Sequence, residues 1–330
     1  MKVLVIQTAF LGDLILTIPL LEVLRNNKEK VHLMALPQFE DILKNHPAVD
    51  RFIPFDKHGR DRGPNGFFRI IKTVRKEKYD RVITPHRSTK TGLILKASGI
   101  SERIGFNKGG ARHFLTQRVE YMTNMHEIER NLSLARALHY IIRYSLFLPV
   151  DKTVLETLKK KLPHDFILVS PGSQWNTKRW KAPYWSRVIR KLVQNHKIVV
   201  TGSTGDAMIW KEVKKELPFD SHPNLLDFVG KTSLKELIAL VSLARLVVVN
   251  DSGTVHIASA LKKKAVVIYG PTLPSFGFTP YGVEHEILEA DVYCRPCSPH
   301  GPKICPMKHH ECMLKIPPEK VLEAINKLLY

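Results

Sequence analysis

The strongest constraint on the fold is a strand, turn, helix and strand pattern in residues 245–272, RLVVVNDSGTVHIASALKKKAVVIYGPT. The apolar run Leu246–Val249 has the length and β-branched composition of a buried parallel strand, and Ala265–Tyr269 repeats that pattern. Between them, Asn250–Thr254 is a polar turn with helix-capping residues, and an apolar helix follows it. Because a helix connects the two parallel strands, the segment predicts a βαβ unit and an α/β fold.

The same turn is a candidate binding site. Backbone N–H groups of Ser252, Gly253 and Thr254 would lie at a helix N-terminus, where the peptide dipoles favour an anion such as a phosphate or diphosphate. An ordinary capped turn has the same sequence pattern, so both interpretations stay open on the turn alone. His256, one turn into the helix, is either a ligand contact or a buried structural histidine.

The rest of the chain alternates strand and helix patterns, which predicts two Rossmann-like, doubly wound parallel sheets. The strands expected are Lys2–Gln7, Val31–Ala35, Arg51–Phe55, Arg81–Thr84, an edge strand at Arg103–Phe106, Phe166–Val169, Lys197–Thr201 and Leu225–Val229. The helices expected are Leu14–Arg25, Gln38–Lys44, Phe67–Lys76, Thr89–Ala97, His126–Phe147, Lys152–Leu162, Tyr184–Gln194, Ala207–Glu216, Ser233–Ala244 and Pro317–Leu329. We therefore expect domains at residues 1–162 and 163–316, followed by a final helix at residues 317–330.

Composition narrows the class of protein. A chain of 330 residues suits two domains, and 44% hydrophobic with 25% charged residues is typical of a globular protein. No secretion signal and no apolar run of about 20 residues is visible, so a cytoplasmic soluble protein is expected. The 51 Lys and Arg residues exceed the 31 acidic residues and give a net charge of +20. This excess favours a polyanion or an anionic membrane surface as partner, although a generally charge-rich surface is the alternative.

Three basic loops follow predicted strands in the first half: Lys57–Arg62, His86–Lys90 and Asn107–His113. Loops carry function more often than the elements that they connect, and Lys and Arg side chains bind phosphates and carboxylates. A solvated basic rim is the competing interpretation. The candidate anion-binding residues in these loops are Arg60, Arg62, Arg87, Lys90, Lys108 and Arg112.

Other polar residues follow predicted strands, at the end where open α/β sheets bind ligands. Asp13 comes after Gly12 at the start of a predicted helix, where its residue type alone favours a plain N-cap. The turn Ser170–Trp180 offers hydroxyls and Lys178 for a diphosphate, and Asp206 offers a carboxylate for a ribose. Neither half contains G-x-G-x-x-G or a P-loop, which disfavours a dinucleotide-dependent dehydrogenase.

Four segments together resemble one family over nearly the whole chain. They are Gly12-Asp13, Pro171-Gly172 with Lys178-Arg179-Trp180, Asn250–His256, and Tyr269-Gly270-Pro271-Thr272. In this order and spacing the chain is similar to the family-9 glycosyltransferases, the ADP-heptose:lipopolysaccharide heptosyltransferases. The Lys-Arg-Trp triplet is closer to heptosyltransferase II than to heptosyltransferase I, where Lys-His-Trp is commoner.

The resemblance implies a GT-B fold, in which two Rossmann-like domains face a cleft, with the acceptor bound by the first and the nucleotide sugar by the second. It implies inversion at the anomeric carbon, no cofactor required for catalysis, and a final helix that crosses back to the first domain. Asp13 would be the general base, and Lys178 would stabilise the leaving ADP. Family positions that contact the donor fall on Ser173, Lys178, Asp206, Thr232 and Asp251.

The function expected from the resemblance is transfer of heptose from ADP-L-glycero-D-manno-heptose to the inner core of lipopolysaccharide. The acceptor is anionic and lipid-borne, so the basic loops would face it and the net charge would hold the enzyme on the inner leaflet. Alternatives are heptosyltransferase I, another family-9 transferase, or a GT-B-like epimerase. A nucleic-acid-binding protein is suggested only by the charge, and because no such module is recognisable we expect no nucleic acid partner.

All four cysteines lie near the C-terminus, at Cys294, Cys297, Cys305 and Cys312, with His300, His309 and His310 nearby. A C-x2-C start is typical of a structural zinc site in a reducing compartment. Two disulfides or free thiols are the other possibilities. In each case a structural role is expected for this cluster, not a catalytic one.

Overall fold

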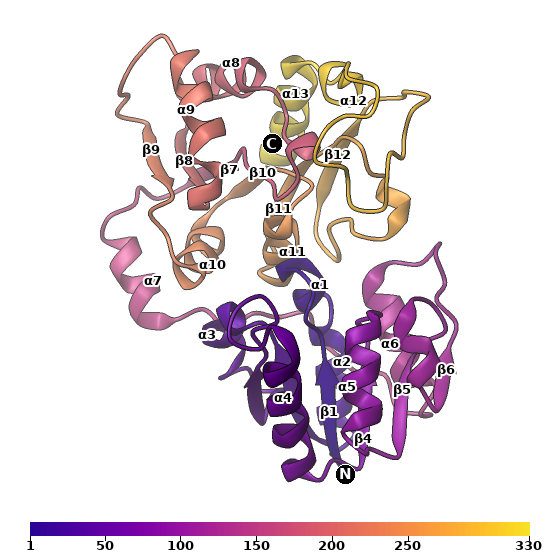
Figure 1. Ribbon diagram of the computed structural model, residues 1–330. Helices are drawn as coiled ribbons and strands as arrows, with labels where there is room; N and C mark the ends of the chain where they lie inside the picture. The colour runs from indigo at the N-terminus through magenta and orange to yellow at the C-terminus, as the bar shows by residue number, and fades with distance from the viewer. The chain divides into compact units, whose positions relative to one another are not determined.

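The computed structural model describes residues 1–330 and divides into two compact units, Met1–Pro149 and Val150–Tyr330 (Figure 1). Each unit contains one six-stranded sheet in which every strand pair is parallel. The division falls before the expected boundary at Leu162. Helix α7 (Lys152–Lys159) packs against α10 (Leu234–Leu243) and therefore belongs to the second unit.

The first sheet has the order β3-β2-β1-β4-β5-β6. Its strands are β1 (Lys2–Ile6), β2 (Lys30–Ala35), β3 (Arg51–Pro54), β4 (Arg81–Thr84), β5 (Glu102–Phe106) and β6 (Gln117–Val119). Five of the six were predicted. The expected edge strand β5 is an interior strand, because the unpredicted three-residue β6 pairs along its outer side.

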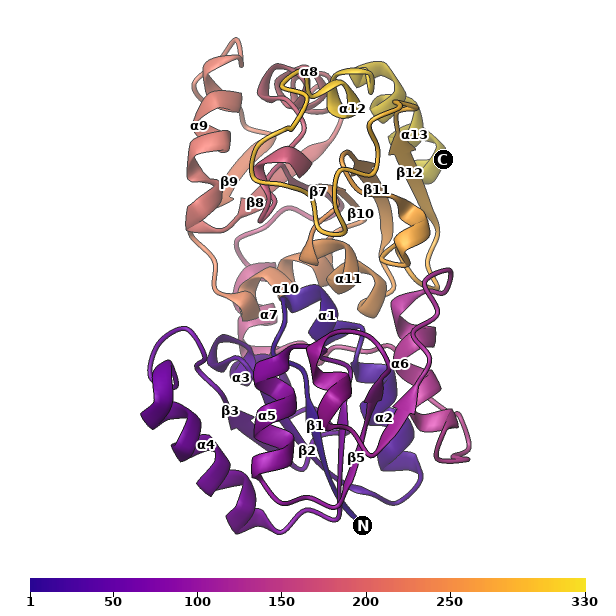
Figure 2. The ribbon, with the colours of Figure 1, turned by 45° about the vertical axis from the view of Figure 1, so that its right-hand side comes forward.

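Helices cover this sheet as the doubly wound prediction requires (Figure 2). Helices α4 and α5 pack together, as do α2 and α6. The helices of the first unit are α1 (Leu11–Ile15), α2 (Ile18–Asn26), α3 (Glu40–Leu43), α4 (Gly63–Glu77), α5 (Thr89–Ala97) and α6 (Glu127–Arg136), with short 3-10 helices η1 (Pro37–Phe39) and η2 (Gly110–Phe114).

The prediction of one long helix over residues 126–147 was wrong. Helix α6 ends at Arg136, and His139 has a left-handed backbone with φ of 56°. The Asn27 side chain makes two hydrogen bonds with the backbone of Ile141. Its oxygen accepts from the Ile141 N–H at 3.2 Å, and its nitrogen donates to the Ile141 carbonyl at 3.0 Å. A tertiary contact with α2 thus replaces the helical hydrogen bonds that the local sequence favours.

The second sheet has the order β12-β11-β10-β7-β8-β9, which repeats the topology of the first sheet. Its strands are β7 (Phe166–Ser170), β8 (Lys197–Gly202), β9 (Leu225–Val229), β10 (Leu246–Asn250), β11 (Lys264–Tyr269) and β12 (His285–Glu289), of which only β12 was not predicted. Its helices are α7, α8 (Ala182–Leu192), α9 (Ala207–Lys215), α10, α11 (Gly253–Ala260), α12 (Glu311–Leu314) and α13 (Pro318–Leu329), with 3-10 helices η3 (Asn176–Lys178), η4 (Thr204–Asp206) and η5 (Pro274–Phe276). The βαβ unit predicted from residues 245–272 is confirmed as β10, α11 and β11.

The strand order locates the ligand-binding end of each unit. In open α/β sheets, ligands bind beyond the carboxyl ends of the strands at the point where the strand order reverses. That point lies between β1 and β4 in the first sheet and between β7 and β10 in the second. Asp13, Lys90, Lys178 and Asp251 are among the candidate residues that follow β1, β4, β7 and β10, whereas others, such as Arg60, Lys108 and Asp206, follow other strands of the two sheets.

The final helix packs within the second unit. Its apolar residues Val321, Ile325 and Leu328 are buried in the same core cluster as Val266 and Ile268 of β11. We expected residues 317–330 to cross back to the first domain. The contacts of α13 instead cover its apolar face with residues of its own unit. None of the helices combines the length and hydrophobicity needed to cross a membrane.

Replacing Ile325 by alanine should destabilise the second unit by about 2–5 kcal/mol, because a fully buried side chain of α13 leaves a cavity. The four tryptophans, Trp175, Trp180, Trp185 and Trp210, all lie in the second unit, so denaturant unfolding followed by tryptophan fluorescence measures the effect. Glu323→Ala on the exposed face of the same helix should change stability by no more than about 0.5 kcal/mol. Equal unfolding midpoints for Ile325→Ala and the unmodified protein would contradict the packing described.

Candidate functional site

Asp13 lies in the first turn of α1, just beyond the carboxyl end of β1. The helix starts at Leu11, so Asp13 is its third residue and not the N-cap that its residue type alone favours. Burial lowers the pKa of Lys57, and Lys90 lowers it further, whereas the Asp13 carboxylate raises it. Burial raises the pKa of Glu127, an effect that Arg130 opposes and Asp13 increases. Asp13 is thus electrostatically linked to a lysine on one side and to a buried carboxyl group on the other.

Thr8, five residues before Asp13, joins the ends of three strands. The Lys57 ammonium donates to the Thr8 carbonyl at 2.6 Å, and the Thr8 hydroxyl lies 3.1 Å from His86 Nδ1. The same nitrogen lies 2.7 Å from the Thr91 hydroxyl. Burial, followed by the nearby Lys57 and Arg87 charges, lowers the pKa of His86 to about 4, so this imidazole is neutral at neutral pH.

Tyr121 gathers cations from three segments. Arg87, Lys108 and Arg130 lie 4.1, 4.9 and 4.8 Å from its ring centroid. The Tyr121 hydroxyl donates to Glu127 at 3.3 Å, and Arg130 Nε donates to the same carboxylate oxygen at 2.7 Å. Neither Tyr121 nor Glu127 was predicted as a site residue, because the local pattern shows Tyr121 as an ordinary loop residue and Glu127 as an ordinary residue of the first turn of a helix.

Two of the predicted basic loops are packed directly together. Gly109 has φ of +78°, and a Cβ there would lie 2.5 Å from the Arg87 carbonyl oxygen, so the close approach requires glycine. The Ala111 N–H donates to that carbonyl at 3.1 Å. Lys90 reaches the third loop, where its ammonium donates to the Asp61 carbonyl at 3.4 Å.

The six predicted anion-binding residues are therefore only partly assembled. Arg87, Lys90 and Lys108 belong to the contacts just described. Arg60 lies 3.8 Å from Asp61, and Arg112 Nε donates to His113 at 3.2 Å. Arg62 is exposed at the N-terminal end of α4 and forms no hydrogen bond or ring contact with Tyr121 or Thr8.

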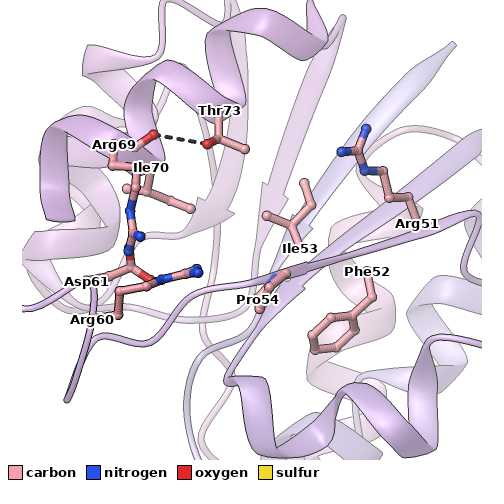
Figure 3. A pocket seen from close by; sticks show the side chains of 9 residues that line it. All are labelled: Arg51, Phe52, Ile53, Pro54, Arg60, Asp61, Arg69, Ile70 and Thr73. Atoms are coloured by element: carbon pink, nitrogen blue, oxygen red, sulfur yellow. Dashed lines mark hydrogen bonds and ion pairs between the residues drawn. The ribbon is translucent and has the colours of Figure 1, made fainter.

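A cavity of about 290 Å³ lies in the first unit between β3 and α4 (Figure 3). Of the predicted anion-binding residues it contains Arg60 alone. Its lining combines apolar side chains with three arginines. The lining residues are Arg51, Phe52, Ile53, Pro54, Arg60, Asp61, Arg69, Ile70 and Thr73.

In the second unit, Asp251 connects the predicted turn to two other loops. Its carboxylate accepts from the Lys178 ammonium at 2.5 Å and from the Thr272 hydroxyl at 2.7 Å. The Ser173 hydroxyl donates to the Asp251 carbonyl at 3.2 Å. The structure thus brings together Ser173, Lys178 and Asp251 as predicted. It adds Thr272, which the sequence analysis quoted in a family motif without giving it a role.

The Asn250 side chain forms hydrogen bonds with the loop that carries Ser173 and Lys178. Its side-chain oxygen accepts from the Trp180 N–H at 3.1 Å, and its amide nitrogen donates to the Pro171 carbonyl at 2.7 Å. The residue is fully buried at the end of β10. An asparagine at the end of an otherwise apolar strand was the available signal for this positioning role.

The backbone beyond Asp251 forms the predicted helix start. Helix α11 begins at Gly253 with Ser252 at the N-cap, so N–H groups of its first turn have no partner within the helix. The buried Ser252 hydroxyl makes no hydrogen bond in the structure. Thr254 and His256 are buried, and the His256 ring lies 6.3 Å from the ring of Phe278.

The Asp206 carboxylate is held by hydrogen bonds from Ser203 and Arg179. Its carboxylate accepts from the Ser203 N–H at 2.9 Å and from the Ser203 hydroxyl at 2.7 Å, in a capping box. Arg179 bridges to it at 3.3 Å while also donating to the Ser173 carbonyl at 2.9 Å. A Cβ on Gly172 would lie 2.2 Å from the Asp206 carboxyl carbon, so the two segments touch. Thr232 is half-buried just before the start of α10.

All four cysteines are free thiols in the structure. Cys294 Sγ lies 4.0 Å from His309 Nε2, and the Cys297 thiol donates to the Cys294 carbonyl at 3.4 Å. Burial, together with the other cysteines, raises the pKa of Cys312 to about 11. No three His, Cys, Asp or Glu side chains are arranged to hold a metal ion, so the zinc and disulfide predictions gain no support from this geometry.

Comparison with known proteins places this geometry in a family. Residues 67–308 match glycosyltransferase family 9 (heptosyltransferase). The chain is 25% identical to lipooligosaccharide heptosyltransferase 2 of Campylobacter jejuni over 332 residues, which cover 99% of each protein.

Solved structures agree on the fold. The crystal structure of a family-9 glycosyltransferase from Veillonella parvula superposes with a TM-score of 0.88 at 23% identity, covering 99% of this chain and 97% of that one. The structure of ADP-heptose lipopolysaccharide heptosyltransferase II from Escherichia coli superposes with a TM-score of 0.81 at 24% identity, covering 100% and 98%. The predicted α/β class, with two Rossmann-like sheets in a GT-B fold, is thereby confirmed. The chain belongs to glycosyltransferase family 9, the heptosyltransferase family, and is a glycosyltransferase.

Proposed function

We propose that this enzyme transfers L-glycero-D-manno-heptose from ADP-heptose to the inner core of lipopolysaccharide, with inversion and without a metal ion. The main observation behind this proposal is that Lys178, Asp251 and Thr272 are hydrogen-bonded together beside the N-terminus of α11, in a member of the heptosyltransferase family. The names of its relatives support heptose as the sugar. The Lys178-Arg179-Trp180 triplet favours heptosyltransferase II.

The second unit would bind the donor. The diphosphate would accept hydrogen bonds from the backbone of Ser252, Gly253 and Thr254, where the dipole of α11 favours negative charge. The unbonded Ser252 hydroxyl offers a further donor at the same place. Lys178 and Ser173 lie beside this turn through their bonds to Asp251. As the glycosidic bond breaks, these groups would stabilise the charge that develops on ADP.

Asp251 would then set the position of Lys178 and contact the sugar. Fixed cations and a helix N-terminus supply the electrostatic stabilisation that a divalent ion supplies in other transferases, which is the physical reason for proposing metal independence. Around the rest of the nucleotide, we assign Asp206 to the ribose side and Thr232 to the adenine side. The contacts of Asp206 with Ser203 and Arg179 leave it fewer free acceptor sites than an exposed carboxylate has.

The first unit would bind the acceptor, with Asp13 as general base. The acceptor hydroxyl must lose a proton as it attacks the anomeric carbon, and a half-buried carboxylate can accept it. Arg87, Lys90 and Lys108 would bind the carboxylates and phosphates of the inner core, since these cations are held together by the contacts of Tyr121 and Asp61. A lipid-borne acceptor would bring the enzyme to the inner leaflet of the inner membrane.

A direct assay tests the reaction and separates the alternatives. The protein is incubated with ADP-heptose and either a heptose-free or a one-heptose lipid acceptor, and product mass and ADP release are measured. Heptosyltransferase II requires the one-heptose acceptor, whereas heptosyltransferase I uses the heptose-free one. Conversion of the nucleotide sugar without any acceptor would identify an epimerase and reject the proposal.

Asp13→Asn should leave ADP binding unchanged and lower kcat about 10²–10⁴-fold, because the substitution removes the proton acceptor while keeping the shape of the side chain. Steady-state kinetics and ADP titration measure the two effects. Asp41→Asn, which changes an exposed carboxylate on α3, is the matched control and should keep full activity. Normal turnover by Asp13→Asn would remove Asp13 from the mechanism.

Lys178→Ala should weaken ADP binding at least about tenfold, because it removes a charge-assisted bond to the diphosphate and leaves the Asp251 carboxylate without its cation. Lys181→Ala removes a lysine at the end of the same loop that forms no ion pair, and this variant should bind ADP normally. Calorimetric titration with ADP gives both affinities. If the two variants bind ADP equally well, Lys178 is not a diphosphate contact.

A further inference from the structure

Helix α4 has two strongly different faces. Ile70, Ile71 and Val74 are buried against the first sheet, and Phe67 packs on the same core. On the outer face, Phe68 is 66% exposed, and Lys72 and Lys76 follow it at helical spacing. An exposed aromatic ring in line with exposed lysines is the pattern of a helix that lies in a membrane interface.

The charge of this face has a single sign. Besides Lys72 and Lys76, it includes Arg62, Arg69, Arg75 and Lys78. The two acidic residues nearby do not offset it: the Asp61 side chain is 1% exposed beneath Arg69, and Glu77 is paired with Lys2 and Arg51. Neither Lys72 nor Lys76 forms an ion pair, and like charges one turn apart repel each other. An anionic surface would relieve that repulsion.

The arginine-lined cavity adjoins this face, since Arg69 and Thr73 of α4 form one of its walls (Figure 3). In Figure 3, Arg60, Asp61 and Arg69 lie close together, and Ile53 and Ile70 line the same cavity. Arg60 and Arg69 share the single carboxylate of Asp61, so positive charge remains at the rim. A cavity lined by both arginines and apolar side chains suits a phosphate attached to an apolar group.

We propose that the outer face of α4 and the adjoining cavity dock the enzyme on a bilayer that contains anionic phospholipid. Phe68 enters the headgroup region, Lys72 and Lys76 lie against lipid phosphates, and the cavity binds one headgroup phosphate. This combination meets the requirement that stable surface binding uses both an apolar and an electrostatic contribution. The proposal rests on the proposed function only in that the acceptor is carried by a lipid.

A nucleic acid fits this surface less well. Proteins that bind single strands present several aromatic rings on which successive bases stack, whereas the exposed face of α4 has Phe68 alone. The neighbouring ring of Phe67 contacts Phe68 edge-on, with centroids 5.9 Å apart, and is directed to the core. The apolar contribution here is a single inserted side chain, as at a membrane interface.

The test is vesicle co-sedimentation of the full chain, comparing phosphatidylcholine vesicles with vesicles that also contain phosphatidylglycerol. The unmodified protein should bind the anionic vesicles and be released by high salt. Lys72→Glu with Lys76→Glu should lower the partition coefficient at least about tenfold, and Phe68→Ser should lower it several-fold. Both variants should keep the unmodified rate on a deacylated, water-soluble acceptor, because neither changes a residue assigned to the reaction.

Helix α9 offers a matched control, because Met208 is 72% exposed and Lys211 and Lys215 lie on its exposed side. Met208→Ser, and Lys211→Glu with Lys215→Glu, should leave vesicle binding within about twofold of normal. Ile304→Ser tests another strongly exposed apolar side chain, in the cysteine-rich segment, and should also bind normally.

Unchanged vesicle binding by the α4 variants, or equal loss in the α9 or Ile304 variants, would overturn the proposal. So would binding to a labelled oligonucleotide that depends on Phe68 while vesicles are not bound. Failure of the proposed function is distinguishable: the unmodified enzyme would then show no transfer to the soluble acceptor, whatever its vesicle binding.

Discussion

The ion pair between Lys178 and Asp251 is the interaction on which the second unit's site depends. The Asp251 side chain is 9% exposed, and a carboxylate removed from water to that extent is strongly destabilising unless it is paired and hydrogen-bonded. Its partners come from the loops after β7 and β11, while Asp251 itself follows β10. One buried charge thereby holds the ends of three adjacent strands in register, and Asn250 beneath it secures the loop that carries the lysine.

The first unit also connects the ends of its strands, but it uses different side chains. At its switch point a neutral imidazole, His86, lies between two threonine hydroxyls, and Lys57 bonds a backbone carbonyl. Cations are arranged around the ring of Tyr121, so their positive charge stays available to a substrate anion. The second unit uses its lysine in an internal pair, whereas the first keeps a surplus of positive charge. This difference agrees with the proposed function, in which the second unit binds one diphosphate and the first binds an acceptor with many anionic groups.

Most of the fold was predictable from sequence because parallel strands buried on both faces are nearly continuous apolar runs, as in β7, β10 and β11. The edge strands β6 and β12 were missed because half-exposed strands lack such runs. The end of α6 was missed because Asn27, far away in the sequence, determines it. Ser173, Lys178 and Asp251 were predictable as polar residues at strand ends. Tyr121 and Glu127 were not, since their roles arise only from partners contributed by other segments.

The two sheets share one strand order, and every contact described around Asp251 lies inside the second unit. The basic loops that surround Thr8 and Tyr121 come entirely from the first. Under the proposed function, the residues that bind the nucleotide sugar and those that bind the acceptor therefore lie in separate parts of the sequence. Loops of the first unit could then differ between relatives that use other acceptors, while the nucleotide-binding residues of the second unit stay the same.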